Sequence, residues 1–288
     1  MPELPEIQAH AERLTATHRG AVLERFEPLT FTALKTAVPD PSGAVGLALT
    51  EVGRRGKHLL LHFGDLPAAG STAEGLTFVV HLMQGGRLVP DEKVSRKPRN
   101  GIARWRFAGE PALLLTEAGT ERKAGVWVVD GDPLRREPLA DLGPDADTVG
   151  RAELDAALDA RNQRVHGFLR DQHGVAGIGR LLANEICHRA KLSPFAMTAR
   201  LSDDERGALL AAIGRCIDDA VAHERTLDRM SKSAERPAAV HHRAGQPCPV
   251  CGDTVRSVEY SAYEVDYCPT CQTGGKVLAD NTTSKFLK

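Results

Sequence analysis

The chain has 288 residues, of which 42% are hydrophobic and 26% charged, and its formal net charge at pH 7 is −1. This composition is that of a globular protein with more than one domain, and it excludes a disordered or fibrous chain. No apolar run approaches the roughly 18 residues of a membrane span, and the acidic start does not resemble a signal peptide. We therefore expect a cytoplasmic protein with no membrane partner. Because a net charge near zero hides local clusters, nucleic-acid binding has to be judged from individual basic segments.

The beginning of the chain, Met1-Pro2-Glu3-Leu4-Pro5-Glu6, contains the residues with the most chemical potential. If Met1 is removed, Pro2 carries a secondary amine that titrates near pH 8 and can attack an electrophilic sugar carbon to form an iminium. Glu3 is adjacent and can transfer protons, and Glu6 lies one helical turn further on, facing the same site. The alternative is an ordinary helix start, in which proline and acidic residues suit the first turn.

Residues 5–18 predict an amphipathic helix. From about residue 21 to 130, short apolar runs separated by Gly, Pro and Asp predict a β-sandwich or barrel-like domain. Lys57 stands at the start of one apolar run, where a lysine is most often a solvated flank. The basic segment 91–106 predicts a solvated hairpin loop, with phosphate contact as the functional alternative.

Residues beyond about 150 predict a helical region, with helices near 151–160, 162–172, 179–190 and 203–223. Between two of these helices lies the run Gly174-Val175-Ala176-Gly177-Ile178-Gly179. Its glycines permit a tight turn, and the free N–H groups of the next helix can bind an anion such as a DNA phosphate. The alternative is a helical hairpin whose glycines serve packing. Residues 161–200 contain seven basic and two acidic side chains, which favours the anion site.

Four cysteines near the C-terminus form a metal-binding pattern. Cys248, Cys251, Cys268 and Cys271 read C-x2-C…C-x2-C with 16 residues between the two pairs. This spacing predicts one structural Zn²⁺ held by four thiolates, with two short strands between the pairs. The polar stretch 224–246 before it predicts a linker. The other two cysteines, Cys187 and Cys216, lie in helical patterns and are expected to be buried thiols.

Together these segments resemble the formamidopyrimidine-DNA glycosylase/endonuclease VIII family of base-excision repair enzymes. The motifs that carry the resemblance are Pro2–Glu6, Arg54–Leu61, Leu142–Pro144, Gly174–Glu185 and the zinc hairpin ending at Cys271-Gln272. It implies an α+β, bilobal fold: a β-sandwich that begins with a catalytic helix, then a helical helix–two-turn–helix domain and a β-hairpin zinc finger. The implied boundaries are 1–135 for the catalytic domain, 136–150 for a linker, 151–240 for the helical DNA-binding domain, 245–273 for the zinc finger and 274–288 for a C-terminal extension.

The resemblance also implies residue roles. Pro2 is the expected nucleophile, Glu3 the proton-transferring acid, Glu6 its support, and Lys57 a contact to phosphate beside a flipped nucleotide. The implied partner is damaged DNA, and the implied enzyme is monomeric, bacterial-type and nucleoid-associated. The Schiff base formed at the sugar permits β- and then δ-elimination, which nicks the strand. The expected DNA-binding positions are Gln84, Lys123, Gly177, Gly179, Arg180 and Tyr263.

Several of these positions depart from the family pattern. Gln84 stands where the family has a methionine, Lys123 where it has arginine, and Ala124 where it has an aromatic wedge. Arg180 replaces an asparagine, and Tyr263 replaces an arginine of the zinc hairpin. Because alanine cannot stack on a base, and stacking is worth about 1–3 kcal/mol, we expect a divergent lesion preference.

Three hypotheses remain open from the sequence. The first is a bifunctional DNA glycosylase/AP lyase. The second is a lyase specific for AP sites, single strands or bulky lesions, which needs fewer gap-filling residues. The third is a non-catalytic protein that binds damaged DNA. The Pro2-Glu3 pair favours the first two.

Overall fold

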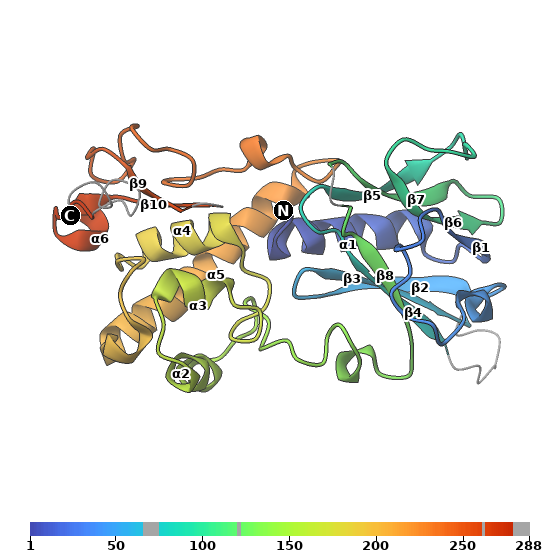
Figure 1. The fold of residues 1–288 in the computed structure, drawn as a ribbon, viewed down its shortest axis with the longest axis horizontal. Coiled ribbons are helices and arrows are strands. Elements are labelled where there is room, and N and C mark those ends of the chain that lie inside the picture. Colours follow the sequence, from blue (N-terminus) through green and yellow to red (C-terminus); the bar gives the residue numbers. More distant parts are fainter. Residues whose placement is uncertain (66–74, 120–121, 261–262, 279–288) are drawn as a thin grey trace. The chain divides into compact units, whose positions relative to one another are not determined.

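A computed structural model of the protein describes residues 1–65, 75–119, 122–260 and 263–278 (Figure 1). The chain divides into a first unit, Met1–Asp141 with Asp228–Met230, and a second unit, Leu142–Leu227 with Ser231–Lys288. Most of the expected C-terminal extension, residues 279–288, lies outside the described residues. Among the described helices, none is both long and apolar enough to cross a membrane.

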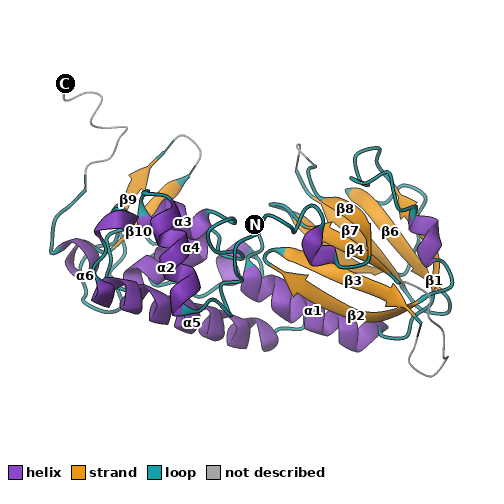
Figure 2. Cartoon of the chain, turned by 90° about the horizontal axis from the view of Figure 1, so that it is seen from below, coloured by secondary structure: helices purple, strands orange, loops and turns teal. Residues whose placement is uncertain are grey.

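The first unit is a β-sandwich that opens with a helix, α1 (Leu4–His18). Its two sheets have the strand orders β1-β6-β7-β5 and β2-β3-β4-β8, and neighbouring strands are antiparallel (Figure 2). The strands of the first sheet are β1 (Leu23–Pro28), β6 (Gly101–Phe107), β7 (Ala112–Glu117) and β5 (Gly86–Asp91). Those of the second are β2 (Ala48–Arg55), β3 (His58–Gly64), β4 (Leu76–His81) and β8 (Gly125–Asp130).

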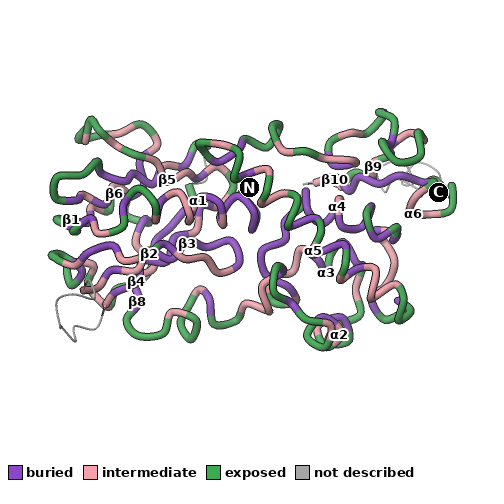
Figure 3. Tube along the Cα trace, turned by 180° about the vertical axis from the view of Figure 1, so that it is seen from behind, coloured by how far each residue is buried: buried purple, intermediate pink, exposed green. Residues whose placement is uncertain are grey.

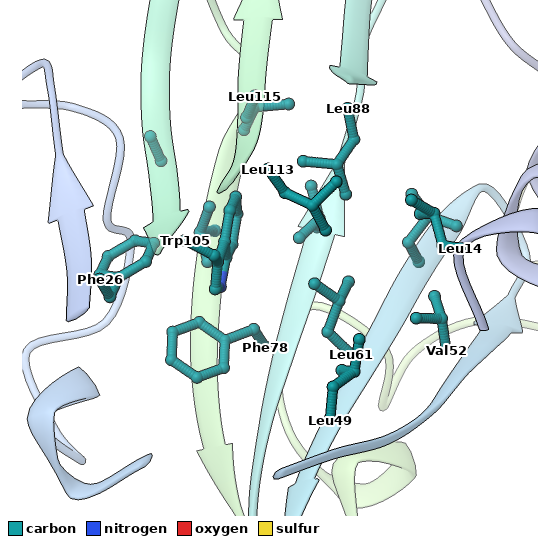
Figure 4. Close-up of a cluster of buried hydrophobic side chains, with 14 of the residues drawn as sticks. Leu14, Phe26, Leu49, Val52, Leu61, Phe78, Leu88, Trp105, Leu113 and Leu115 are labelled. Carbon is teal, nitrogen blue, oxygen red and sulfur yellow. The ribbon is translucent and has the colours of Figure 1, made fainter. Parts of the chain in front are cut away.

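The core of this unit lies between the two sheets and beneath α1. Phe78 from β4 packs edge-on against Trp105 from β6, with ring centroids 6.0 Å apart, and Leu14 brings α1 into the same cluster (Figure 4). Both Phe78 and Trp105 are fully buried. Aromatic and branched side chains of this kind favour a pleated, half-buried surface, which explains why the region folds as the predicted sandwich.

The second unit consists of helices followed by a small hairpin. The elements are α2 (Arg151–Ala160), α3 (Val165–Arg170), α4 (Arg180–Arg189), α5 (Asp203–Arg225), β9 (Arg256–Glu259), β10 (Glu264–Tyr267) and α6 (Pro269–Thr273). Helix α5 begins with a capping box, in which the hydroxyl of Ser202 accepts the N–H of Glu205 and the Glu205 carboxylate accepts the N–H of Ser202. Figure 3 shows that α2 is largely exposed, while α4 is largely buried. The fold is thus α+β, as predicted.

Helix α3 is shorter than the predicted segment 162–172, because a distant segment forms hydrogen bonds with the backbone at the start of this segment. The N–H of Val165 donates to the carbonyl of Ala196, and the Thr198 hydroxyl donates to the carbonyl of Arg161. Backbone groups that would have closed the first helical turn are therefore bonded to a distant segment, a competition that local periodicity does not reveal.

Candidate active site and zinc centre

The start of α1 gathers the predicted catalytic residues in a buried position. Glu3 is the residue that caps the helix, Pro5 lies in its first turn, and a carboxylate oxygen of Glu6 accepts the backbone N–H of Glu3 at 2.5 Å. Glu3 and Glu6 are only 4% and 3% exposed, and Pro2 is buried as well. Glu6 therefore fixes the backbone that carries Glu3 and Pro2.

Side-chain contacts orient α1 along strand β2. The Thr15 hydroxyl exchanges hydrogen bonds with the backbone of Val52, and the Arg54 guanidinium donates to the Gln8 side chain at 2.9 Å. Thr15 and Gln8 are two turns apart on the helix. Val52 and Arg54 are two positions apart on β2, and Arg54 is the nearer to its C-terminal end. The start of α1 is therefore directed toward the end of β2 that leads to Lys57.

Lys57 lies in the tight turn between β2 and β3, where Arg55 pairs with His58. Gly56 has φ +54°, a conformation that favours glycine over residues with a side chain. Lys57 is only 8% exposed, so the expectation of a solvated flank is wrong. A buried ammonium group at the same end of the sheet as α1's start is a cationic centre that can hold a phosphate.

Two histidines beside Lys57 stay neutral. The rings of His58 and His81 pack edge to face with centroids 4.6 Å apart. Burial, followed by the charge effect of His81, lowers the pKa of His58 to about 3, and burial together with the Lys57 charge lowers the pKa of His81 to about 4. The Nδ1 atom of His81 accepts the N–H of Met83 at 3.0 Å, which orders the loop that follows β4. No local pattern had singled out His58.

The strand register of the second sheet brings the loops that carry the expected DNA-binding residues Gln84 and Lys123 to the same end of that sheet. His58 pairs with His81, and His81 pairs with Gly125, so the Lys57 turn, the loop with Gln84 and the loop with Lys123 are neighbours. Gln84 and Lys123 are both exposed. The residues of the second loop before Arg122, 120–121, lie outside the described part of the chain.

Ala124 differs from its neighbour Lys123 because it faces the core. It is 1% exposed, and its N–H donates to the Glu117 carboxylate at 2.6 Å. The side chain at the position where the resemblance implies an aromatic wedge is therefore both small and buried. Glu117, which anchors this loop, carried no signal in the sequence.

The basic segment 91–106 is only partly the predicted solvated loop. Strand β6 begins at Gly101, and Arg104 is 2% exposed, with hydrogen bonds to the carboxylates of Glu27 at 3.0 Å and Asp91 at 2.8 Å. Because this cation is buried and already paired with two carboxylates, it is excluded as a phosphate contact.

The glycine turn of the second unit joins α3 to α4. Gly177 has φ +106°, and its N–H donates to the side-chain oxygen of Gln172 at 3.0 Å, while the Gln172 amide donates to the carbonyl of Ile178. Gly179 caps α4, and Arg180 is the exposed first residue of that helix. Gln172 thus stabilises the turn from within, a role that the glycine pattern alone did not indicate.

Tyr263 lies in an aromatic and cationic cluster near this turn. Its ring stacks on Tyr260 with centroids 4.8 Å apart, and the Arg170 guanidinium lies over the ring at 4.4 Å. The Tyr260 hydroxyl receives a hydrogen bond from Arg164 at 2.8 Å. A pocket of about 260 Å³ is lined by Arg180, His242, Glu259, Tyr260, Tyr263 and Glu264. The structure therefore brings Tyr263 and Arg180 together.

Four thiols meet beside β9 and β10. The Sγ atoms of Cys248 and Cys271 are 3.9 Å apart, and those of Cys251 and Cys268 are 3.3 Å apart. Tetrahedral zinc with Zn–S bonds of about 2.3 Å requires sulfur separations of roughly 3.8 Å, so a thiolate set of this size fits the ion. His188 of α4, which the sequence did not single out, lies in the same cluster.

The expected linker 224–246 is held to the helices at two places. Its first residues complete α5, which ends at Arg225. The Glu185 carboxylate on α4 accepts three consecutive N–H groups, those of Ala239, Val240 and His241, at 2.7 to 3.0 Å. Because Glu185 is more than fifty positions away, local composition could not predict this anchor.

Comparison with known proteins places this fold and these motifs in one family. The models that match are the formamidopyrimidine-DNA glycosylase N-terminal domain over residues 1–125, its H2TH domain over 141–231, and the zinc finger found in FPG and IleRS over 245–274. The formamidopyrimidine-DNA glycosylase of Desulforamulus reducens is 30% identical in an alignment of 289 positions that covers 94% of this chain and 99% of that protein.

Two further proteins show the extent of the similarity. An uncharacterized formamidopyrimidine-DNA glycosylase-like protein of Mycobacterium tuberculosis is 44% identical over 151 residues, 51% of this chain and 94% of its own length. The crystal structure of the MutM (Fpg) protein from Thermus thermophilus is 25% identical, with a TM-score of 0.79 over 96% of this chain and 100% of that one.

These similarities define a DNA-repair glycosylase with a zinc finger. The chain belongs to the formamidopyrimidine-DNA glycosylase/endonuclease VIII family. Its zinc finger binds one structural zinc.

Proposed function

We propose that this chain is a bifunctional DNA glycosylase/AP lyase that acts on damaged DNA, as a monomer in the cytoplasm and associated with the nucleoid. Its catalytic domain is residues 1–135, and residues 151–240 and 245–273 bind DNA. The observation that carries the proposal is the buried start of α1, where Glu6 fixes the backbone of Glu3 next to Pro2.

The proposed reaction begins after removal of Met1, which frees the Pro2 nitrogen. That nitrogen attacks C1′ of the flipped nucleotide, the bond to the damaged base breaks, and the base leaves with a proton that Glu3 supplies. The Pro2 nitrogen then loses its proton, and its lone pair expels O4′, which takes up a proton, so that the sugar ring opens to an iminium. The iminium makes the 2′-proton acidic, and loss of that proton eliminates the 3′-phosphate. Loss of the 4′-proton then eliminates the 5′-phosphate. Flipping the nucleotide costs the duplex a few kcal/mol, and less if the base is already unstacked.

Charged and polar groups hold the DNA in this proposal. Lys57, buried beside the neutral pair His58 and His81, neutralises a phosphate next to the lesion. In the second unit, the turn that Gly177 shapes leads to Gly179 and Arg180, and the N-terminus of α4 that they form binds a backbone phosphate without reading sequence. Gln84 and Lys123 extend from their loops toward the duplex, and Tyr263 contributes through Arg170, which lies over its ring.

The zinc has a structural role in this proposal. Cys248, Cys251, Cys268 and Cys271 bind the ion. Their four thiolates fill its coordination shell and leave no open position for an activated water, so the site is structural and not catalytic. A bound zinc supplies the folding energy that a hairpin as short as β9–β10 cannot obtain from its own core.

A second candidate is a lyase for AP sites, single strands or bulky lesions, which the small, buried Ala124 favours. A non-catalytic DNA-binding protein is the third. A protein of the same fold, the Lactococcus lactis Fpg, has a solved complex with DNA that contains an abasic site. A lesion panel with borohydride trapping separates the three: excision of damaged bases with trapping supports the first, trapping on AP sites alone the second, and binding without trapping the third.

A further inference from the structure

A fifth donor lies within the cysteine cluster. His188, in the last turn of α4, is 6% exposed, and its Nε2 atom is 3.3 Å from Sγ of Cys248. The donor atoms of His188, Cys248, Cys268 and Cys271 all lie within 4.8 Å of one another. An imidazole nitrogen and three thiolates are by themselves a complete set of ligands for zinc.

The fourth cysteine has a different environment. Cys251 is exposed, whereas Cys248 and Cys268 are 2% and 0% exposed. Cys251 reaches the cluster through Cys268, at an Sγ–Sγ distance of 3.3 Å. Since structural zinc takes four ligands, five converging donors leave one in excess.

We propose that His188 is a reserve zinc ligand. While all four cysteines hold the ion, the His188 ring donates a hydrogen bond to the Cys248 thiolate. When Cys251 is lost, His188 takes the fourth position and the ion stays bound. The ring comes from α4, so the second set of ligands joins the zinc directly to the helix whose start forms the phosphate-binding turn. This inference rests on the proposed set of four cysteine ligands and does not depend on the proposed catalysis.

The experiment measures metal content and cobalt spectra in the full-length chain. Cys251→Ser is expected to retain about one zinc per chain. After exchange with Co²⁺, its sulfur-to-cobalt charge-transfer absorption should fall by about a quarter, since three thiolates replace four. His188→Gln keeps a hydrogen-bond donor but removes the imidazole, and alone it should retain the zinc and the four-thiolate spectrum. The double variant should lose the metal at chelator concentrations that the single variants withstand.

Cys268→Ser is the matched control, because it removes a member of the His188 set and should lose zinc. The reserve role is overturned if Cys251→Ser loses zinc as readily as Cys268→Ser, or if the double variant binds zinc as well as Cys251→Ser alone. Precipitation or unfolding of Cys251→Ser also counts against it, since a reserve ligand should keep the finger folded. Absence of zinc from the wild-type protein would instead refute the cysteine site itself.

Discussion

The buried start of α1 and the exposed positions that we propose contact DNA follow different physical rules. Glu3, Glu6 and Lys57 are each less than a tenth exposed, and the helix, a turn and a sheet end hold them. Gln84 and Lys123 are exposed and contribute nothing to the core. The first set agrees with the family pattern and the second departs from it. Residues that serve both packing and chemistry are hard to replace, whereas exposed loop residues can change lesion choice without destabilising the fold.

The largest predicted effect tests the buried set. Glu3→Gln should slow base excision by on the order of 10²–10⁴-fold, the usual contribution of a positioned acid, and should spare part of the cleavage of preformed AP sites. Single-turnover kinetics on both substrates measures this difference. Glu24→Gln, at an exposed position of β1, is the matched control and should behave as wild type. Normal excision by Glu3→Gln would remove Glu3 from the mechanism.

A second prediction concerns the loop that carries Lys123 and the buried Ala124. Without an aromatic wedge at Ala124, flipping from a well-stacked pair should lose about 1–3 kcal/mol, or roughly ten- to hundredfold in flipped population. The enzyme should therefore cleave AP sites and bubbles faster than it excises 8-oxoguanine opposite cytosine. Its dependence on the opposite base should be weak, because Lys123 offers a point charge where arginine offers a planar fork. Faster excision of 8-oxoguanine opposite cytosine, with strong discrimination against adenine, would contradict this prediction.

A third prediction concerns the neutral histidines beside Lys57. The unfolded chain binds a proton on each ring near pH 6.5, but the pKa of folded His58 is about 3 and that of His81 about 4. Stability should therefore fall as pH drops below 6.5, by up to about 1.4 kcal/mol per pH unit for each ring. The free energy of unfolding, measured with denaturant between pH 6 and 4, should fall less steeply with decreasing pH in His58→Gln than in the wild type. An equal slope in His58→Gln would show that the buried ring does not govern acid stability.

The smallest predicted effect concerns Tyr263. Its ring holds Arg170 at 4.4 Å, and an exposed cation–π contact is worth about 0.5–1 kcal/mol. Tyr263→Ala should weaken DNA binding about two- to fivefold, whereas Tyr263→Phe, which keeps the ring, should bind as wild type. Fluorescence anisotropy with an AP-site duplex measures both variants. If Tyr263→Phe fails as badly as Tyr263→Ala, the hydroxyl and not the ring is responsible.

The sequence predicted the parts of the molecule that local patterns encode. Hydrophobic periodicity predicted α1 and the sandwich, and cysteine spacing predicted the zinc site. The missing parts are contacts between residues distant in the chain: His188 with Cys248, Glu185 with the 239–241 backbone, and Arg104 with Glu27. Each depends on tertiary geometry that one sequence does not contain. The local interpretation of Lys57 as a solvated flank was wrong for the same reason, because burial of a turn residue depends on what packs around it.

The central claim is that the Pro2 nitrogen becomes bonded to the DNA, and one measurement tests it directly. The protein is mixed with an AP-site duplex and borohydride, digested, and the cross-linked peptide is sequenced by mass spectrometry. We predict a single adduct on an N-terminal peptide that begins at Pro2, with Met1 absent. In Pro2→Gly, at matched DNA binding, the adduct should form much more slowly, because the secondary amine is replaced by a less nucleophilic primary amine. A cross-link on a lysine such as Lys57, or full lyase activity in protein that retains Met1, would contradict it.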